Sequence, residues 1–127
     1  MQVSQKRYAD ALVLTPVGRI DNSTTDALRA DLSAHLATCT KSGDRLVLDF
    51  SQVDYISSVG LRVLMLAAKK AREQDGAIVV AALQPVVREI FEISRFNLVF
   101  QCFGTVREDL GKISVTALAA YDSARGA

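Results

Sequence analysis

The sequence predicts an α/β domain with a mostly parallel central sheet. Three observations support this class: apolar runs of strand length, amphipathic segments of helix length between them, and turn or helix-cap residues at the junctions. The predicted order is β-β-α-β-α-β-α-β-α, with helices packed on the sheet and right-handed crossovers between parallel strands. Half of the 127 residues are hydrophobic, which is enough to bury one continuous core.

The chain begins with two expected strands, residues 3–8 and 11–17, joined by a tight turn at Ala9–Asp10. Pro16 has no N–H for a strand ladder, so it indicates an irregular strand end. The residues from Asp21 to Thr24 can accept hydrogen bonds from a helix start, which predicts a helix directly after them.

The middle of the chain carries the next strand and helix. The apolar run from Leu46 to Phe50 is typical of a buried parallel strand. Residues 51–55 are interpreted as a connection. A second helix should begin near Ser57 and Ser58 and end before Gly76, which suits the left-handed position after a helix.

Two further apolar runs, residues 77–83 and 98–103, are predicted to be strands. Pro85 suits the first position of the helix between them. Thr105 with Glu108 predicts a capping box, which begins a final helix.

The final helix is expected to run to about Tyr121 as a C-terminal extension of a single domain that spans residues 1–121. Residues 122–127 are expected to form a flexible tail. Four apolar residues at helical spacing should face the core: Leu110, Ile113, Ala117 and Leu118. Three others are placed on the outer side: Ser114, Thr116 and Tyr121.

Charge and composition argue against several classes of protein. Fifteen basic and fourteen acidic residues give a net charge of +1, which provides no electrostatic reason for binding nucleic acid or an anionic membrane. No run approaches the roughly 18 apolar residues of a transmembrane helix, and the first residues do not resemble a signal peptide. Cys39 and Cys102 lack a Cys-x-x-Cys spacing and are interpreted as reduced thiols. A cytoplasmic location is therefore expected.

Conventional catalysis is not predicted. The single histidine, His35, is expected at the edge of the core, and without further ligands a transition-metal site is not expected. The glycine-rich loops that hold nucleotides are absent, as is the Gly-x-Ser-x-Gly motif of serine hydrolases. We therefore expect neither an enzyme nor a cofactor.

The segment from Asp54 to Leu61, DYISSVGL, is the most informative part of the sequence. Loops after parallel strands gather at one edge of a sheet, where ligands and partners bind. One interpretation is that Ser57 or Ser58 only caps the helix. The alternative is that an exposed hydroxyl beside free helix N–H groups accepts a phosphate, which adds roughly −1.5 to −2 charges and changes partner binding.

The ordered motifs of the chain resemble those of the anti-sigma-factor antagonists, whose fold is the STAS domain. The matching segments, spread over residues 3–105, are GRID at 18–21, LVLDFS at 46–51, ISSVGL at 56–61, Gly76, and LQPVVREIF at 83–91. The resemblance implies a STAS-like single domain with Ser58 as the phosphoacceptor. Ser57 is the alternative acceptor, because it stands where the family commonly has aspartate, and Val59 replaces a common second hydroxyl residue.

The resemblance also implies partner switching. The unphosphorylated protein would bind an anti-sigma factor that is also a serine kinase with a histidine-kinase-like ATPase fold, and would thereby free the sigma factor. Phosphorylation would release the complex, and a serine phosphatase would reset it. The chain is expected to be a monomer or a weak dimer. The expected partner-binding residues are Asp21, Asn22, Ser23, Ser57, Ser58, Val59, Gly60 and Arg62. For Asp21, a plain helix cap is the alternative interpretation.

Other functions are compatible with the same sequence. One is a STAS scaffold or accessory subunit of a larger assembly that is not phosphorylated, including a subunit of a lipid transporter. Another is a module that binds a small molecule or nucleotide at the edge of the parallel sheet.

Overall fold

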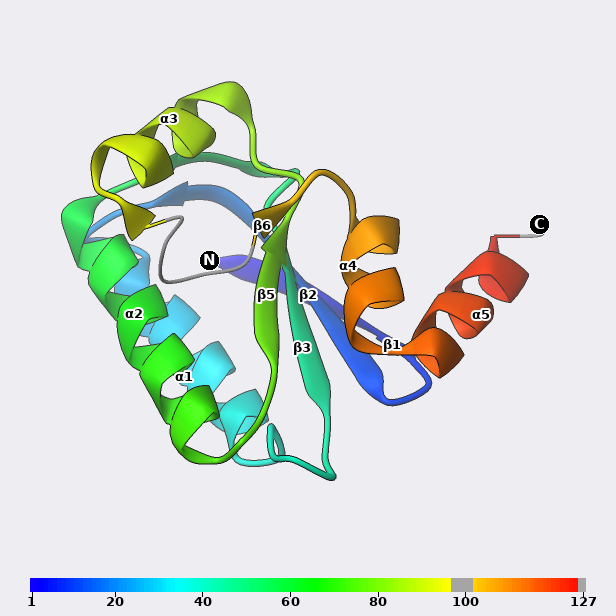
Figure 1. The fold of residues 1–127 in the computed structure, drawn as a ribbon. Coiled ribbons are helices and arrows are strands. Elements are labelled where there is room, and N and C mark those ends of the chain that lie inside the picture. The colour runs from blue at the N-terminus through cyan, green and yellow to red at the C-terminus, as the bar shows by residue number, and fades with distance from the viewer. Residues whose placement is uncertain (97–101, 126–127) are drawn as a thin grey trace.

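The computed structural model describes residues 1–96 and 102–125, and its architecture confirms the predicted α/β class (Figure 1). The strands are β1 (Gln2–Tyr8), β2 (Ala11–Ile20), β3 (Arg45–Asp49), β4 (Val53–Ile56), β5 (Ile78–Ala81) and β6 (Cys102–Phe103). The helices are α1 (Thr25–Leu36), α2 (Ser58–Glu73), α3 (Pro85–Ile93), α4 (Val106–Ile113) and α5 (Val115–Ala124).

The strands form one sheet in the order β1-β2-β3-β5-β6, and β4 pairs with β2 outside this path. β1 is antiparallel to β2, whereas the other paired strands are parallel. Helices α1 and α2 lie on one face of the sheet, and α4 and α5 lie on the other (Figure 1).

Both faces of the central strands are buried because each is covered by helices. In β3, Leu46 and Leu48 belong to the core that includes residues of α1 and α2. Val47, which lies between them, belongs to a second core with Leu110 of α4 and Ala117 of α5. Successive strand residues point to opposite faces, so a strand buried on both sides reads as an uninterrupted apolar run.

Strand β4 is the main difference from the predicted order. Residues 51–55 were interpreted as a connection, but Val53–Ile56 pairs in parallel with the end of β2. Only Val53 and Ile56 of this strand are buried, and a run of four residues with Asp54 inside it is too short and irregular to form a recognisable strand pattern.

Strand β2 is longer than predicted and changes its neighbour along its length. It pairs with β3 over Ala11–Leu14 and with β4 over Gly18–Ile20. Pro16 lies between these two stretches, so its missing N–H interrupts neither ladder. The proline therefore marks a change of partner within the strand.

The helix ends follow the sequence signals with one correction. Pro85 begins α3, and the Thr105 side chain accepts a hydrogen bond from the Glu108 N–H at the start of α4, as predicted. The left-handed residue after α2 is Asp75, with φ +58°, and not Gly76. Gly76 is needed for a different reason, because a Cβ there would lie 2.3 Å from the carbonyl oxygen of Cys39.

The C-terminal segment forms two helices where one was predicted, because Ser114 ends α4 and its side chain caps α5. Leu110 and Ala117 are fully buried, as predicted, and Ile113 and Leu118 pack beside them. The predicted strand over 98–103 is described only as Cys102–Phe103, because residues 97–101 lie outside the described part of the chain.

Of the three residues predicted on the outer side of the C-terminal segment, Thr116 is exposed, whereas Ser114 and Tyr121 are half-buried against the β1–β2 hairpin. The hydroxyls of Ser114 and Thr116 both donate to the carboxylate of Asp10, and the Tyr121 ring packs edge-on against Tyr8. Helix α5 continues to Ala124, so residues 122–124 of the expected tail are helical.

Asp109 is an ionisable group in the core between α4 and the sheet. Its side chain is fully buried, and neither carboxyl oxygen has a hydrogen-bond partner among the residues that the structure describes. Burial, with smaller contributions from the charges of Glu108 and Asp49, raises the pKa of Asp109 to about 8. The folded state therefore favours the protonated, neutral carboxyl.

The stability of the protein should depend on the pH through Asp109. Since the carboxyl pKa rises from 3.8 to about 8 on folding, ionisation destabilises the folded protein progressively from about pH 4 to pH 8. Asp109→Asn removes this effect. Measured by urea denaturation, Asp109→Asn should therefore gain about 1–3 kcal/mol of stability relative to the wild type between pH 5 and pH 8.5.

The control is Glu89→Gln, which removes an exposed carboxylate on α3 that does not contribute to the raised pKa of Asp109. Its unfolding free energy should follow the wild-type pH profile closely. A constant difference between Asp109→Asn and the wild type at both pH values would contradict the buried, protonated state.

Candidate functional site

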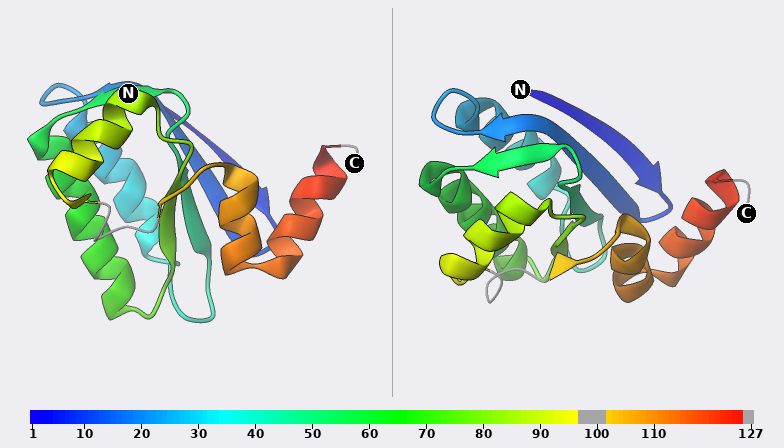
Figure 2. Two further views of the ribbon diagram at one scale, coloured as in Figure 1. Left: turned by 45° about the horizontal axis from the view of Figure 1, so that its top comes forward. Right: turned by 90° about the horizontal axis from the view of Figure 1, so that it is seen from above.

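The loops that carry the predicted site meet because β2 and β4 end side by side. Ile20 pairs with Ile56, and the backbone N–H of Ser57 donates to the carbonyl of Ile20 over 2.8 Å. The Asp21 loop and the start of α2 therefore leave the sheet at the same edge (Figure 2). The structure brings these two predicted segments together.

The loop after β2 is held by its own hydrogen bonds. The Asp21 Oδ1 accepts from the backbone N–H of Ser23 over 2.9 Å and from its hydroxyl over 2.6 Å. The bond from the Ser23 hydroxyl is the main cause that lowers the pKa of Asp21. Asp21 is half-buried, whereas Asn22 and Ser23 are exposed, so the loop presents two polar side chains in a fixed arrangement.

The Asp21 side chain braces the loop and does not cap α1. The N-cap of α1 is Thr24, whose hydroxyl accepts from the Asp21 N–H over 2.9 Å and donates to the Arg19 carbonyl over 2.8 Å. The helix-cap interpretation of Asp21 is therefore wrong for its carboxylate. Its backbone carbonyl does accept from the N–H of Thr25, the first residue of α1.

Arg19 and Tyr55 form a contact beside this loop that the sequence analysis missed. The guanidinium carbon of Arg19 lies 4.3 Å from the centre of the Tyr55 ring, and its Nε lies 3.4 Å from the Asp21 carboxylate. A cation over an aromatic face is stabilised by the ring electrons. The pairing of β4 with β2 places the two residues opposite each other, so the contact could not be found while β4 was unrecognised.

The two adjacent serines have different roles. Ser57 is the N-cap of α2 and is half-buried, and its hydroxyl oxygen accepts from the Gly60 N–H over 3.2 Å. Ser58 is the first helical residue and is exposed, and its hydroxyl makes no hydrogen bond to a described residue. The capping function thus belongs to Ser57, which leaves the Ser58 hydroxyl free.

The other predicted residues of α2 separate into surface and core. Val59 and Arg62 are exposed, and Arg62 forms no ion pair with a described residue. Gly60 is buried, and a Cβ there would lie 2.6 Å from the Ile20 Cγ2 and 2.8 Å from the Ile56 Cγ1. Gly60 therefore supports the site by letting α2 approach the ends of β2 and β4, and it offers little surface to a partner.

A groove runs beside Ser58 between the start of α2 and the segment after α3. It encloses about 440 Å³ and is lined by Ser58, Val59, Leu61, Arg62, Met65, Ser94 and Phe96. Met65 exposes 44% of its surface and Val59 exposes 39%, so apolar side chains surround the serine. We refer to this surface as the Ser58 groove.

The sequence analysis missed Met65, Ser94 and Phe96 as part of this groove. Met65 follows the buried Leu64 directly, and its apolar character gives no sign that it lies on the exposed side of α2. No local signal marks Ser94 or Phe96, because they reach the groove only through the packing of α3.

Neither a metal site nor a membrane segment is found in the described residues. In residues 1–96 and 102–125, no group of three histidine, cysteine or acidic side chains is placed to hold a metal ion. None of the helices described there has both the length and the apolar character needed to cross a membrane.

Residues 1–101 match the protein family described as "Mlab, STAS domain". The match includes β1–β5 and α1–α3, and therefore both the Asp21 loop and the start of α2. The chain therefore belongs to the STAS-domain family.

Within this family the chain is an anti-sigma factor antagonist. It is 38% identical over 100 residues to the "Putative anti-sigma factor antagonist BtrV" of Bordetella bronchiseptica, in an alignment that covers 79% of this chain and 84% of that protein. Anti-sigma factor antagonists are regulators and not enzymes, so the prediction of a non-enzymatic protein is confirmed.

Solved structures share the fold at low sequence identity. An anti-sigma factor antagonist from Mycobacterium paratuberculosis has a TM-score of 0.79 at 24% identity, and the match covers 88% of this chain and 92% of that one. The unphosphorylated anti-sigma factor antagonist SpoIIAA has a TM-score of 0.72 at 15% identity, with 88% of this chain and 96% of that one covered. Another structure, of the Bacillus SpoIIAA, shows that protein phosphorylated.

The role of Gly60 can be tested against a second helical glycine. Gly60→Ala should destabilise the protein by about 2–3 kcal/mol, because the added methyl group overlaps Ile20 and Ile56. In Gly111→Ala the new methyl group would lie 3.5 Å from the Leu118 Cδ2, an ordinary contact, so that variant should be as stable as the wild type or more so. Thermal unfolding of both variants measures the difference, and equal melting temperatures would contradict the packing role of Gly60.

Because Ser57 caps α2 and the Ser58 hydroxyl is free, alanine variants of the two residues should lose different amounts of stability. Ser57→Ala should lower the free energy of unfolding by about 1 kcal/mol, because the Gly60 N–H loses its acceptor. Ser58→Ala should change it by less than about 0.5 kcal/mol. Urea denaturation would reveal a reversed order if Ser58 were the cap.

Proposed function

We propose that this protein works by partner switching controlled by phosphorylation of Ser58. The unphosphorylated form binds an anti-sigma factor with serine kinase activity and a histidine-kinase-like ATPase fold, which frees the sigma factor. Phosphorylation then releases the complex, and a serine phosphatase restores the binding form. The supporting observation is the exposed Ser58 hydroxyl, without a hydrogen bond to a described residue, inside a groove with apolar walls.

The local structure favours Ser58 over Ser57 as the acceptor. A kinase must reach the hydroxyl and remove its proton, and the Ser58 side chain is exposed. The Ser57 oxygen is half-buried and already accepts from the Gly60 N–H. Phosphorylation of Ser57 would therefore disturb the start of α2, whereas phosphorylation of Ser58 leaves the cap in place.

The fold can carry a phosphate on Ser58 without unfolding. The group would stand at the first residue of α2, where the free N–H groups and the helix dipole favour negative charge. Arg62 lies four residues further along the same helix, and side chains at this spacing are neighbours on the helix surface. Because Arg62 has no other ionic partner among the described residues, its guanidinium is available to the phosphate.

The same phosphate should weaken the binding of a partner. Val59, Met65 and Phe96 give the Ser58 groove apolar walls, and a partner that covers them would remove the phosphate from water. Burying a charge without a matching group costs several kcal/mol, and each 1.4 kcal/mol weakens binding tenfold. The exposed residues Asn22 and Ser23 of the neighbouring loop extend the proposed partner surface.

In this proposal the protein acts as a kinase substrate and binding module in the cytoplasm. It requires no cofactor of its own, since the kinase supplies the nucleotide chemistry. A monomer or weak dimer is sufficient, because the Ser58 groove is formed by a single chain.

The first test is intact-mass spectrometry with fragmentation after co-expression with the candidate anti-sigma kinase. We expect one added phosphate on Ser58 in the wild type and in Ser57→Ala, and none in Ser58→Ala. A phosphate that persists in Ser58→Ala would assign the acceptor elsewhere. Absence of phosphate from all three proteins would contradict partner switching and support an unphosphorylated STAS scaffold.

The second test measures binding of the purified kinase partner to both forms of the protein. The phosphorylated form should bind at least about a hundredfold more weakly, which corresponds to about 2.7 kcal/mol. Circular dichroism of the two forms should be the same, because the phosphate acts at the interface and not on the fold. Equal affinities would show that the modification does not control the partner.

A further inference from the structure

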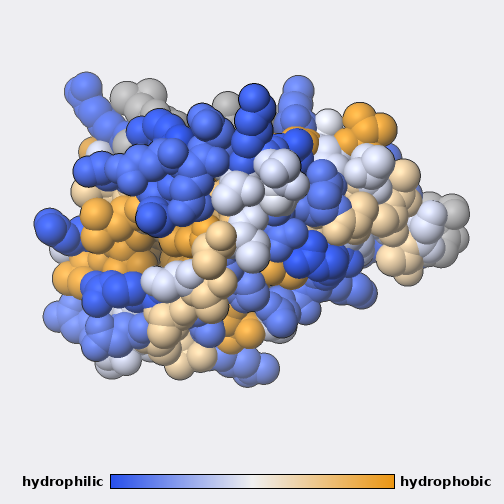
Figure 3. All heavy atoms as spheres, turned by 90° about the horizontal axis from the view of Figure 1, so that it is seen from below, coloured by the Kyte–Doolittle hydropathy of each residue, from blue (hydrophilic) through white to orange (hydrophobic). Residues whose placement is uncertain are grey.

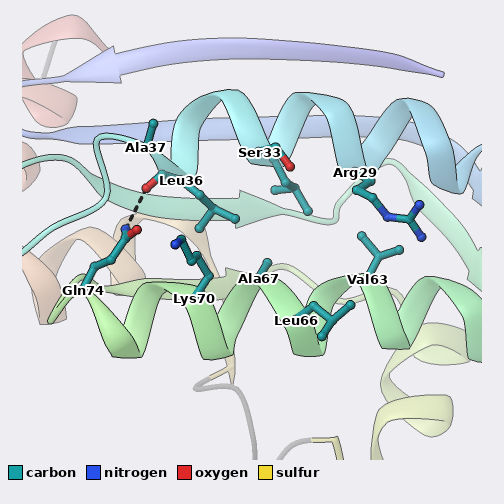
Figure 4. A pocket seen from close by; sticks show the side chains of 10 residues that line it. Arg29, Ser33, Leu36, Ala37, Val63, Leu66, Ala67, Lys70 and Gln74 are labelled. Carbon is teal, nitrogen blue, oxygen red and sulfur yellow. Dashed lines mark hydrogen bonds between the residues drawn. The ribbon is translucent and has the colours of Figure 1, made fainter.

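A second cavity lies between α1 and α2, on a side of α2 different from the Ser58 groove. It encloses about 490 Å³, a volume within the range of small-molecule sites. Its apolar wall includes Leu32 and Leu36 from α1 and Val63, Leu66 and Ala67 from α2. We call this cavity the α1–α2 slot (Figure 4).

One end of the slot is closed by a side chain that ties the two helices together. The Gln74 Nε2 donates to the carbonyl of Leu36 over 2.8 Å and to that of Cys39 over 2.9 Å. Figure 4 shows this bond at the end of the slot where Lys70 lies. The slot therefore has polar groups held in place at this end and apolar side chains along its length.

The charges that line the slot are all positive. Among the described residues, the only charged ones in its wall are Arg29 and Lys70. Arg29 pairs with Asp26 at 3.3 Å, but the Asp26 side chain is 92% exposed, so that pair is weak. Lys70 has no ionic partner among the described residues, and its side chain points into the space between the helices (Figure 4).

The lining and length of the slot suit an acyl chain. Three of its lining side chains, Leu32, Leu36 and Val63, are buried, with 2%, 8% and 4% of their surface exposed. The α1 residues of the wall extend from Arg29 to Ala37, which at 1.5 Å per residue is about 12 Å, comparable to a medium acyl chain.

We propose that the α1–α2 slot binds a single-chain fatty acid. The acyl chain lies along Leu66, Val63 and Ala67, and the carboxylate forms an ion pair with Lys70 at the closed end. Figure 3 shows hydrophobic side chains exposed between hydrophilic ones on the side of the molecule where α1 and α2 lie. This site does not depend on phosphorylation of Ser58, although both sites use α2.

The experiment is isothermal titration of the full-length protein with dodecanoate below its micelle concentration. Three ligands with the same chain are compared: dodecanoate, dodecanol and dodecyltrimethylammonium. Saturable binding of dodecanoate is expected, about tenfold weaker binding of dodecanol, and no binding of the cationic ligand. Lys70→Gln should weaken dodecanoate about tenfold, whereas Lys69→Gln, on an exposed neighbour outside the slot, should not.

A second pair of variants tests the location without changing charge. Ser33 lines the slot and is exposed, so Ser33→Phe should fill the slot and abolish binding while the domain stays folded. Ala34→Phe places the same ring on an exposed neighbour outside the wall and should leave binding intact. Thermal unfolding without ligand confirms that both variants are folded.

Three results would overturn the proposal: no saturable binding of dodecanoate, equal binding of the cationic ligand, or full binding by Ser33→Phe. Binding of an acidic amphipathic peptide at the slot, with no binding of dodecanoate, would also overturn it and assign this face to a protein partner.

Discussion

The site depends on the parallel pairing of the last residues of β2 and β4. Ile20 lies opposite Ile56, and the hydrogen bond from the Ser57 N–H to the Ile20 carbonyl joins the Asp21 loop to the start of α2. Gly60 completes this junction because only a residue without a side chain lets the helix pack against both isoleucines. Without this pairing, the Asp21 loop and the start of α2 would no longer form one surface.

The junction also explains how one short segment meets two opposing requirements. A helix start needs a fixed cap, while a modified residue needs an accessible side chain. Ser57 satisfies the first requirement with its bond to the Gly60 N–H, and Ser58 is left to satisfy the second. Placing the two functions on adjacent residues allows the charge of the surface to change while the backbone beneath it stays the same.

The sequence predicted the class of the fold and the position of most elements because their signals are local. The apolar run Leu46–Phe50, Pro85 and the Thr105–Glu108 pair each act within a few residues. Strand β4 was missed because only Val53 and Ile56 are buried in it. The left-handed turn was assigned to Gly76, while the structure places it at Asp75 and uses the glycine for its close approach to Cys39.

Prediction of the site had a similar limit. Ser57 and Ser58 could be recognised because they adjoin a helix start, and the exposed positions of Asn22 and Ser23 agree with a surface loop. Tyr55 was missed with β4, and Phe96 joins the Ser58 groove only through the packing of α3. Gly60 was expected to touch a partner, but its neighbours Ile20 and Ile56 come from other parts of the chain. Contacts between residues that are far apart in the sequence can be identified only from the tertiary structure.

The second core has a consequence for how this domain can be shortened or exchanged. The family match ends at residue 101, whereas the helices that cover this face of the sheet begin at Val106. Val47 and Val79, which are 0% and 3% exposed, would face water in a chain that stopped at the family boundary. Such a fragment would need a second copy or another protein to shield its sheet, so a soluble minimal domain must retain α4 and α5.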